Sequence, residues 1–428
     1  MPTAIGQPMR RYSATRFRGL DVKSSPQELA SNPKFRDRLT LARNIVFPKT
    51  GGASKRFDAV QYNTTTLGAT VTIIGGVQFR HSNGTDYNIC AADDGTIRRL
   101  NTNGTTTTLA SGLTTTPTQA FFAQMNDLLI YGDRVNAPRS YDGTTEGALA
   151  GTPPATGGPW AVHGNRVFAL DATNRRRVSW CALNDAEDWT AAGDAGSMTV
   201  SGRNGSPLVF LLPLTNELEL GHRDFVTRLQ GTSPATFAIT NAVPAQVSTG
   251  GISFAGAAFG ANDGWYVSQR GLHRIATTQA FGDLREEFAS ETIDPFFTAG
   301  TDYTLSLNQL TLAVLAYDTQ NNRVYLGVDN NNDGENDTVL CLDVFLNLAT
   351  KGDLGWSVWT GLSCASMWPV YTGVNAVEMF MGGYDGFVRR LNVDDDENAI
   401  NARFNHITDL NDPGWQKNLR HLRVYAKE

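Results

Sequence analysis

The chain has 428 residues, of which 41% are hydrophobic and 18% charged, so most of it can fold around a large buried core. Its longest apolar run, LVFLLPL at 208–214, is far shorter than the ~20 residues that a membrane-spanning helix needs. Residues 1–19 contain no apolar segment of the kind that a secretory signal carries, and we therefore expect a protein made in the cytoplasm.

The formal net charge of −6 is divided unevenly along the chain. Residues 1–60 contain 12 Lys and Arg against 4 Asp and Glu, whereas the remaining residues contain 24 against 38. Such a basic arm is expected to dock on an acidic partner or on acidic faces of neighbouring copies. Few aromatic residues lie among its basic ones, which ranks direct nucleic-acid binding lower.

The chain divides into three parts. Residues 1–60 are predicted to form an arm with a short helix starting at Ser25-Pro26. Residues 61–393 alternate short apolar runs with Gly, Asn and Asp turns, which predicts an all-β sandwich, barrel or propeller. Within this body, residues 283–297 are predicted to be a helical insertion that Asp283 caps and Pro295 ends. Residues 394–428 are expected to supply a C-terminal strand that completes a platform or the ring.

Repeated segments favour the propeller. DDGTIRRLN (93–101) and YDGFVRRLN (384–392) share an Asp-Gly turn, and HGNRVFALD (163–171) matches QNNRVYLGV (320–328). Alternation places Ile97 and Leu100 on opposite faces of one strand, as expected where a sheet is packed between two others. At ~40–50 residues per blade, the body would hold about six blades, six or seven by this arithmetic. A pair of stacked sandwiches is the competing architecture.

The paired arginines of the repeat accompany no nucleophile, base or metal set, and we expect them to pair with carboxylates of the blades; the alternative is that they face a channel or a neighbouring subunit. They are Arg98, Arg99, Arg389 and Arg390. The four cysteines form no CxxC pair and are predicted to be buried free thiols. The eight tryptophans mostly flank strands, so packing between sheets is favoured over stacking on carbohydrate.

The sequence contains none of the enzyme motifs GxSxG, GxxxxGK[ST], GxGxxG and HExxH. Its six histidines are scattered, with no pair at metal-ligand spacing. We therefore predict no catalytic residues, no cofactor site and no enzyme activity. One loop, DNNNDGEND at 329–337, matches the oxygen-ligand spacing of a calcium loop. Its candidate ligands are Asp329, Asn331, Asp333, Glu335 and Asp337. Leu340 stands where the bidentate Glu belongs, and a polar hairpin is the alternative; a bound Ca²⁺ would be structural.

Five segments follow one another in a definite order: 42–57 (ARNIVFPKTGGASKRF), 177–239, 250–275, 288–297 (FASETIDPFF) and 401–426. Together they resemble bacteriophage tail hub or nozzle proteins, and the resemblance covers most of the chain. It implies a β-propeller with a platform, assembled as a homo-oligomeric ring, a hexamer, under the portal and the head-to-tail adaptor of a short-tailed phage. The tail class stays open, because phages of other types carry related propellers.

The resemblance also implies a function. Such proteins close the virion, retain packaged double-stranded DNA, let it pass at infection, and in some cases carry tail fibres or spikes at the host cell surface. The protein would be assembled in the host bacterial cytoplasm and would reside in the virion tail. An acidic body suits a conduit, because Lys and Arg contacts with phosphates would slow DNA passage. The alternative is a glycan-binding or glycan-cleaving propeller, motivated by the tryptophans and the calcium loop.

Overall fold

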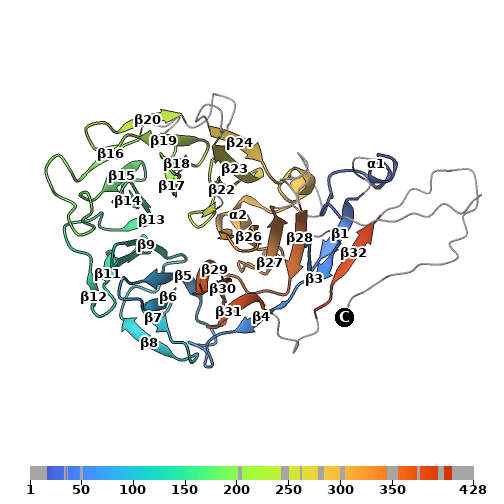
Figure 1. Ribbon diagram of the computed structural model, residues 1–428, viewed down its shortest axis with the longest axis horizontal. Coiled ribbons are helices and arrows are strands. Elements are labelled where there is room, and N and C mark those ends of the chain that lie inside the picture. The colour runs from blue at the N-terminus through green and yellow to red at the C-terminus, as the bar shows by residue number, and fades with distance from the viewer. Residues whose placement is uncertain are drawn as a thin grey trace, which may run out of the picture.

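Seven antiparallel sheets of four strands surround a common axis, and two further strands extend one of them (Figure 1). The computed structural model describes residues 17–32, 35, 37–48, 52–200, 205–241, 250–260, 263–277, 284–298, 304–344, 355–373, 376–393 and 400–406. The protein is thus an all-β propeller, as predicted. Its seven blades correct the prediction of about six.

The first strand of each blade contacts the first strands of both neighbouring blades, so these seven strands surround the axis. Blade 1 consists of β5 (Ile73–Arg80), β6 (Asp86–Ala92), β7 (Thr96–Leu100) and β8 (Thr106–Ala110). Blade 2 consists of β9 (Phe121–Met125), β10 (Leu128–Gly132), β11 (Arg139–Tyr141) and β12 (Glu146–Ala148). Blade 3 consists of β13 (Gly157–His163), β14 (Arg166–Asp171), β15 (Arg177–Trp180) and β16 (Gly196–Thr199).

Blades 4 and 5 continue the same pattern. They consist of β17 (Leu208–Pro213), β18 (Leu218–His222), β19 (Val226–Gln230), β20 (Ala238–Asn241); and β21 (Ala257–Gly260), β22 (Asp263–Ser268), β23 (Gly271–Thr277), β24 (Leu284–Phe288). Blades 6 and 7 contain β25 (Val314–Asp318), β26 (Arg323–Val328), β27 (Thr338–Asp343), β28 (Gly355–Thr360); and β29 (Ser366–Gly373), β30 (Ala376–Gly382), β31 (Val388–Val393).

The repeated segments occupy equivalent positions. Asp94-Gly95 turns from β6 into β7, and Asp385-Gly386 turns from β30 into β31, so both lead into the third strand of a blade. Although far apart in sequence, blades 1 and 7 are neighbours in the ring. Asn165 and Asn322, which begin the second shared motif, both adopt a positive φ, 56° and 49°, in the turn before the second strand of blades 3 and 6. The repeats are therefore architectural.

One apolar cluster lies at each of the seven blade interfaces in the described part of the chain. Ile97 packs in the cluster between blades 1 and 2, whereas Leu100 packs in the cluster between blades 7 and 1. This confirms that β7 is buried on both faces. Each sheet thus contributes two apolar faces, which is why its strands contain long apolar runs in place of a simple alternation.

The N-terminal segment closes the ring. Strand β4 (Asp58–Gln61) pairs with β31 and supplies the outer strand of blade 7, with Arg389 opposite Gln61. The boundary predicted between residues 60 and 61 falls inside this strand. Hydrogen bonds between β4 and β31 therefore join the two ends of the propeller sequence.

The arm packs against its own propeller. The short helix α1 (Pro26–Ser31) begins after the cap Ser25, as predicted. Strand β1 (Leu39–Arg43) runs parallel to β28, and β32 (Arg403–His406) pairs with β1, so blade 6 becomes a six-stranded sheet. A small hairpin of β2 (Ile45–Val46) and β3 (Ser54–Lys55) follows.

Residues 284–297 do not form the predicted helix, and its predicted cap, Asp283, lies outside the described residues. Residues 284–288 form β24, which pairs with β23 as the outer strand of blade 5, and a 3₁₀ helix η2 (Glu291–Phe296) follows. The sequence LREEF is rich in helix formers, but pairing with β23 provides backbone hydrogen-bond partners along one side of the strand. The short helix α2 (Leu307–Thr311) precedes blade 6. No helix in the described residues is long and apolar enough to cross a membrane.

Candidate functional surfaces

The axis of the propeller is crossed by the segment Gly250–Gly256, which links blades 4 and 5. Its Gly251 N–H donates to the backbone carbonyl of His222 in blade 4 (2.7 Å), and its Ser253 Oγ–H donates to the Ala313 carbonyl beside blade 6 (2.6 Å). Phe254 lies under the guanidinium of Arg134 from blade 2, 3.9 Å from its ring centroid. Since blades 2 and 5 are as far apart as two blades of seven can be, the segment spans the axis.

A four-stranded antiparallel blade places its second turn and its link to the next blade at the same end. We call this end of the propeller the link face. A cavity of ≈130 Å³ lies there, lined by residues that include Asp93, Gln119, Gly334 and Tyr384, from blades 1, 2, 6 and 7. The lining mixes apolar, amide and carboxylate groups, and it includes neither a histidine nor a cysteine.

The arginines of the repeat behave largely as expected. Arg98 donates to Asp94 (2.6 Å), and Arg389 donates to both oxygens of Asp385 (2.9 and 2.5 Å). Each pair links a strand to its own Asp-Gly turn. The hydrogen bond from Arg389 is the main cause that lowers the pKa of Asp385. These ion pairs stabilise the Asp-Gly turns, and the carboxylates of Asp94 and Asp385 are used in them.

The second arginine of each copy differs. Arg390 lies 3.7 Å from Glu378 of the neighbouring strand, which agrees with the expected carboxylate partner. Arg99 instead donates its Nε–H to Asn101 (3.2 Å) and lies over the ring of Tyr87, 5.8 Å from the centroid. Three of the four arginines thus pair with carboxylates of the blades.

The predicted calcium loop connects β26 to β27 on the link face. Both carboxylate oxygens of Asp329 accept backbone N–H groups of the same loop, at 2.6 and 2.9 Å. Asp333 Oδ1 accepts the N–H of Glu335 (2.9 Å), and Asn331 Oδ1 accepts the N–H of Asp333 (3.1 Å). Asp337 Oδ1 accepts another loop N–H at 3.1 Å. Burial, followed by the nearby Asp333, raises the pKa of Glu335.

These contacts are those of a hydrogen-bonded polar turn, the alternative left open by the sequence. In the described part of the chain, no three His, Cys, Asp or Glu side chains gather closely enough to hold a metal ion. The geometry therefore gives no support to a donor set for Ca²⁺ here, and the calcium site stays a prediction.

Aspartates that cap link-face turns recur around the ring. Asp133 Oδ1 accepts two N–H groups of its turn (2.9 and 2.7 Å), and Asp171 Oδ1 does the same in blade 3 (2.8 and 3.2 Å). Asp94 and Asp385 accept one each. The shared role explains why acidic residues follow so many second strands: they satisfy the turn's backbone donors.

The largest groove of those we describe lies between blades 2 and 3 and has a volume of ≈400 Å³. One wall is the link from β12 to β13, with Thr152 and Pro153; the floor is the polar outer part of blade 3, with Asp171, Arg177 and Ser179. Sequence reasoning missed this groove, because it joins a link, three strands of blade 3 and the loop that contains Trp189.

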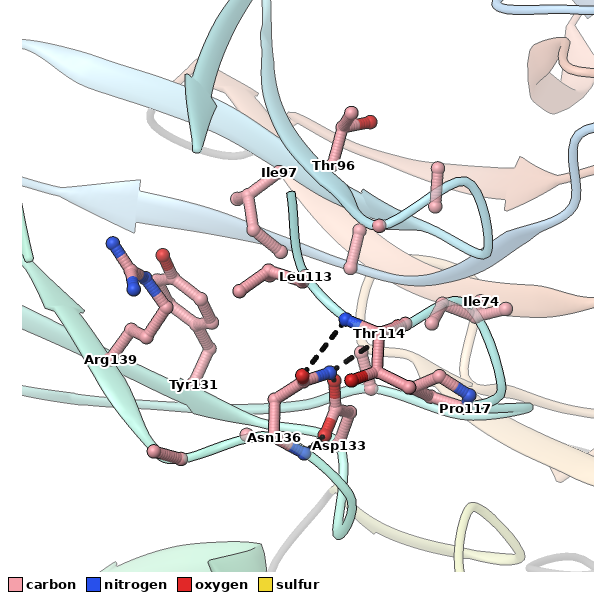
Figure 2. Close-up of a pocket in the computed structure, with 16 residues that line it drawn as sticks. Ile74, Thr96, Ile97, Leu113, Thr114, Pro117, Tyr131, Asp133, Asn136 and Arg139 are labelled. Atoms are coloured by element: carbon pink, nitrogen blue, oxygen red, sulfur yellow. Dashed lines mark hydrogen bonds between the residues drawn. The ribbon is translucent and has the colours of Figure 1, made fainter. Parts of the chain in front are cut away.

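A second inter-blade space, between blades 1 and 2, is a pocket of ≈20 Å³ (Figure 2). Asn136 crosses beneath it and bonds Asp133 (2.6 Å) and the backbone N–H of Thr114 (3.0 Å). A volume of this size accommodates about one water molecule. The cavity is thus too small for a substrate.

The buried histidines have structural surroundings. His273 Nε2 lies 2.8 Å from Ser268 Oγ, a spacing that nucleophilic catalysis also uses. However, Ser268 is 0% exposed and also accepts a backbone N–H from Arg270, so no substrate reaches its hydroxyl. His222 contacts Ser206 O (3.1 Å), and burial lowers its pKa.

The predicted interior roles of cysteine and tryptophan are confirmed where the structure describes them. All four cysteines are buried and unpaired with one another. Seven tryptophans are buried, and none is more than 8% exposed among these seven, which favours packing over stacking on sugars. The buried tryptophans are Trp160, Trp180, Trp189, Trp265, Trp356, Trp359 and Trp368. Trp415 lies outside the described residues.

No family model matches the sequence, and no curated protein matches it. Solved structures that resemble the fold include the computationally designed Ika8 protein (13% identity, 78% of this chain and 100% of that one, TM-score 0.44). Virginiamycin B lyase from Staphylococcus aureus aligns at 11% identity over 78% of this chain and 98% of its own (TM-score 0.49). The WD40 β-propeller domain of Doa1 aligns at 12% identity over 79% and 98% (TM-score 0.45). Similarities this distant say nothing of this protein's activity.

Proposed function

We propose that the protein is a structural component of a bacteriophage virion, a tail nozzle or hub subunit that assembles as a ring beneath the portal and adaptor. In this role it would retain packaged DNA and form the conduit for its ejection. The observation that carries the proposal is the sheet of blade 6, which the two ends of the described chain extend beyond the propeller as β1 and β32 (Figure 1). A scaffold domain with an appended sheet suits assembly, and the sequence contains, in order, the segments that resemble the phage proteins.

The edge strand β32 is the surface we assign to contacts between subunits. Within the described residues it pairs on one side only, with β1, and edge strands readily pair with other chains. Phe404 on this strand is 44% exposed and packs against Phe17 of the arm, with ring centroids 5.4 Å apart. Exposed aromatic side chains beside a sheet edge are typical anchors for a partner.

The crossed axis adds a constraint on the proposed conduit. Because Gly250–Gly256 spans the axis of the propeller, DNA would pass between subunits of a ring and not through a single propeller. The acidic balance of the propeller residues suits surfaces along which DNA slides, since few cations would hold its phosphates.

Electron microscopy and native mass spectrometry test the proposal, on the purified protein alone and mixed with the adaptor protein encoded in the same genome. We expect rings, formed at least in the presence of the adaptor. Phe404→Asp should weaken assembly, whereas Phe259→Asp, which changes an equally exposed phenylalanine (44%) on blade 5, should not. A protein that stays monomeric with the adaptor at high concentration would refute the proposal.

A glycan-binding or glycan-cleaving propeller is the second candidate. The buried tryptophans weaken it, because sugar-stacking sites need an exposed aromatic face. The polar groove between blades 2 and 3 favours it. A glycan array and a hydrolase screen on the intact protein separate the candidates: turnover of a saccharide would promote this function over the structural role.

A further inference from the structure

We propose that the groove between blades 2 and 3 binds a small hydroxylated anion, a sugar that bears a carboxylate or a phosphate. The groove arises from unequal strand lengths. The two outer strands of blade 2 have three residues each, β11 and β12, whereas β15 and β16 of blade 3 have four. Part of the blade 3 sheet is therefore left without a facing strand, and the link 152–155 forms the opposite wall. The volume of ≈400 Å³ falls within the range of small-molecule sites.

The floor of the groove is polar, because two serines of neighbouring strands line it. Ser179 lies opposite Ala169 on one side and Ser197 on the other. Residues directly opposite share a face of the sheet, and Ala169 packs in the cluster between blades 2 and 3. Both serines therefore face blade 2, and both line the groove.

Ser179 is only 4% exposed, and its Oγ has no hydrogen-bond partner among the described residues. Buried hydroxyls are nearly always satisfied, so the unpartnered hydroxyl of a residue that lines the groove can accept or donate a hydrogen bond to a ligand or a solvent molecule bound there. Ser197 and Thr173 add two further hydroxyls to the lining. A ring of hydroxyls suits a ligand that itself carries several hydroxyls.

Arg177 gives the groove its preference for an anion. Its side chain is 42% exposed, and its Nε is buried without a hydrogen-bond partner in the described part of the chain. The closest carboxylate oxygen, Oδ2 of Asp171, is 3.8 Å away, too far for a hydrogen bond. Asp171 instead uses its Oδ1 to cap its own turn. The guanidinium therefore keeps donors for an incoming oxyanion, which it can bind in a bidentate manner.

The surroundings agree with binding, not cleavage. Arg175 and Arg176 are exposed on the same turn, but neither lines the groove. Asp171 is the one carboxylate among the lining residues, all of which the structure describes, whereas glycosidases generally need two. Trp189 contributes an apolar side, since its indole N–H already donates to Ala186 (2.9 Å).

Calorimetric titration of the intact protein with glucuronate, glucose 6-phosphate and glucose tests the proposal. We expect saturable binding of at least one anionic sugar and much weaker binding of glucose. The two anions distinguish a carboxylate site from a phosphate site, and either result supports the inference. No saturation by either anion at millimolar concentration, or equal binding of neutral glucose, would overturn it.

Variants locate the site. Arg177→Gln should weaken binding of the anion at least about tenfold, the loss expected for a charge-assisted hydrogen bond. Arg176→Gln removes the same charge one residue away without touching the groove lining and should change affinity less than about twofold. Ser179→Ala is a second substitution in the groove floor, one that leaves the charge unchanged, and it should also weaken binding of the anion. Equal losses for Arg176→Gln and Arg177→Gln would show non-specific attraction and contradict the assignment, and circular dichroism checks that each variant folds.

Discussion

The closure of the ring between blades 7 and 1 can be tested by removing one side chain, Phe380. This residue of β30 is 1% exposed and belongs to the cluster between the two blades. Its ring centroid lies 4.9 Å from that of Tyr62, which follows the closing strand β4, and 6.0 Å from that of Trp368. Phe380 thus contacts the N-terminal segment and the last blade at once.

Phe380→Ala should lower the free energy of unfolding by about 3–5 kcal/mol, the usual cost of emptying a buried phenylalanine site. Loss of the two aromatic contacts places the value toward the upper end, since each contributes roughly 0.5–1.5 kcal/mol beyond its buried area. Urea denaturation followed by tryptophan fluorescence measures this change. The matched control is Phe404→Ala, which removes a ring that is 44% exposed and should cost less than about 1 kcal/mol.

Hydrogen exchange decides whether the reasoning about closure is right. In Phe380→Ala, amide exchange should rise first in β4, β31 and β5, because these strands meet at the closing interface. A loss under about 1 kcal/mol would refute the packing argument. An increase in exchange spread evenly over all blades would show that the closing interface is not a separate weak point.

Three further predictions concern a buried carboxyl group, two glycines and the four thiols. Glu219 is 0% exposed, and burial raises its pKa well above 4.5. The stability of the wild-type protein should therefore fall relative to that of Glu219→Gln as the pH rises from 4.5 through the native pKa. Parallel pH profiles of the two melting temperatures would contradict this. Gly95→Ala should lower the free energy of unfolding by about 2 kcal/mol or more, because φ is +76° and a Cβ would lie 2.2 Å from the Leu113 carbonyl oxygen. Gly84→Ala, at φ +84° but in open space, should lower it by about 1 kcal/mol, and urea denaturation measures both changes. All four thiols are buried, with the pKa of Cys90 raised to about 12 by burial, so a thiol reagent at pH 8 should react with the unfolded chain and spare the native protein.

The sequence predicted the local features of the propeller well, because the signals for turns and two-sided strands are short. Asp94-Gly95 and Asn322 need only a tight turn, and the alternation of Ile97 and Leu100 needs only one strand. The number of blades was wrong because it depends on pairing over long distances. Strand β4 completes a blade whose other strands lie more than 300 residues later, and the strands of three residues in blade 2 are too short to leave a pattern.

Two other results show why surfaces are harder to predict than strands. The basic arm was predicted to dock on an acidic partner or on acidic faces of neighbouring copies, and that stays a prediction. Part of its charge is used within the chain: Arg38 pairs with Asp21 at 2.7 Å, and Arg56 is 3% exposed and donates to Asn44. The groove between blades 2 and 3 depends on a mismatch in strand length and on which polar side chains lack a partner. Neither property can be read from a single segment, so the sequence around Arg177 gave no indication of the groove.

The extension of blade 6 explains how a subunit contact could be transmitted to the propeller. The sheet order β25-β26-β27-β28-β1-β32 runs without a break from the axis to the outer edge. The arm is bonded to the same sheet, since Leu20 N–H donates to the Trp356 carbonyl (2.8 Å), and the Trp356 indole donates to Ala289 beside blade 5 (2.9 Å). A partner bound at β32 would therefore pull on a continuous hydrogen-bonded sheet anchored in the core between blades 5 and 6. Force on the proposed ring would reach the propeller through the junction of β1 with β28, where Arg43 lies opposite Val358 and the Asn44 N–H donates to the Val358 carbonyl (2.8 Å).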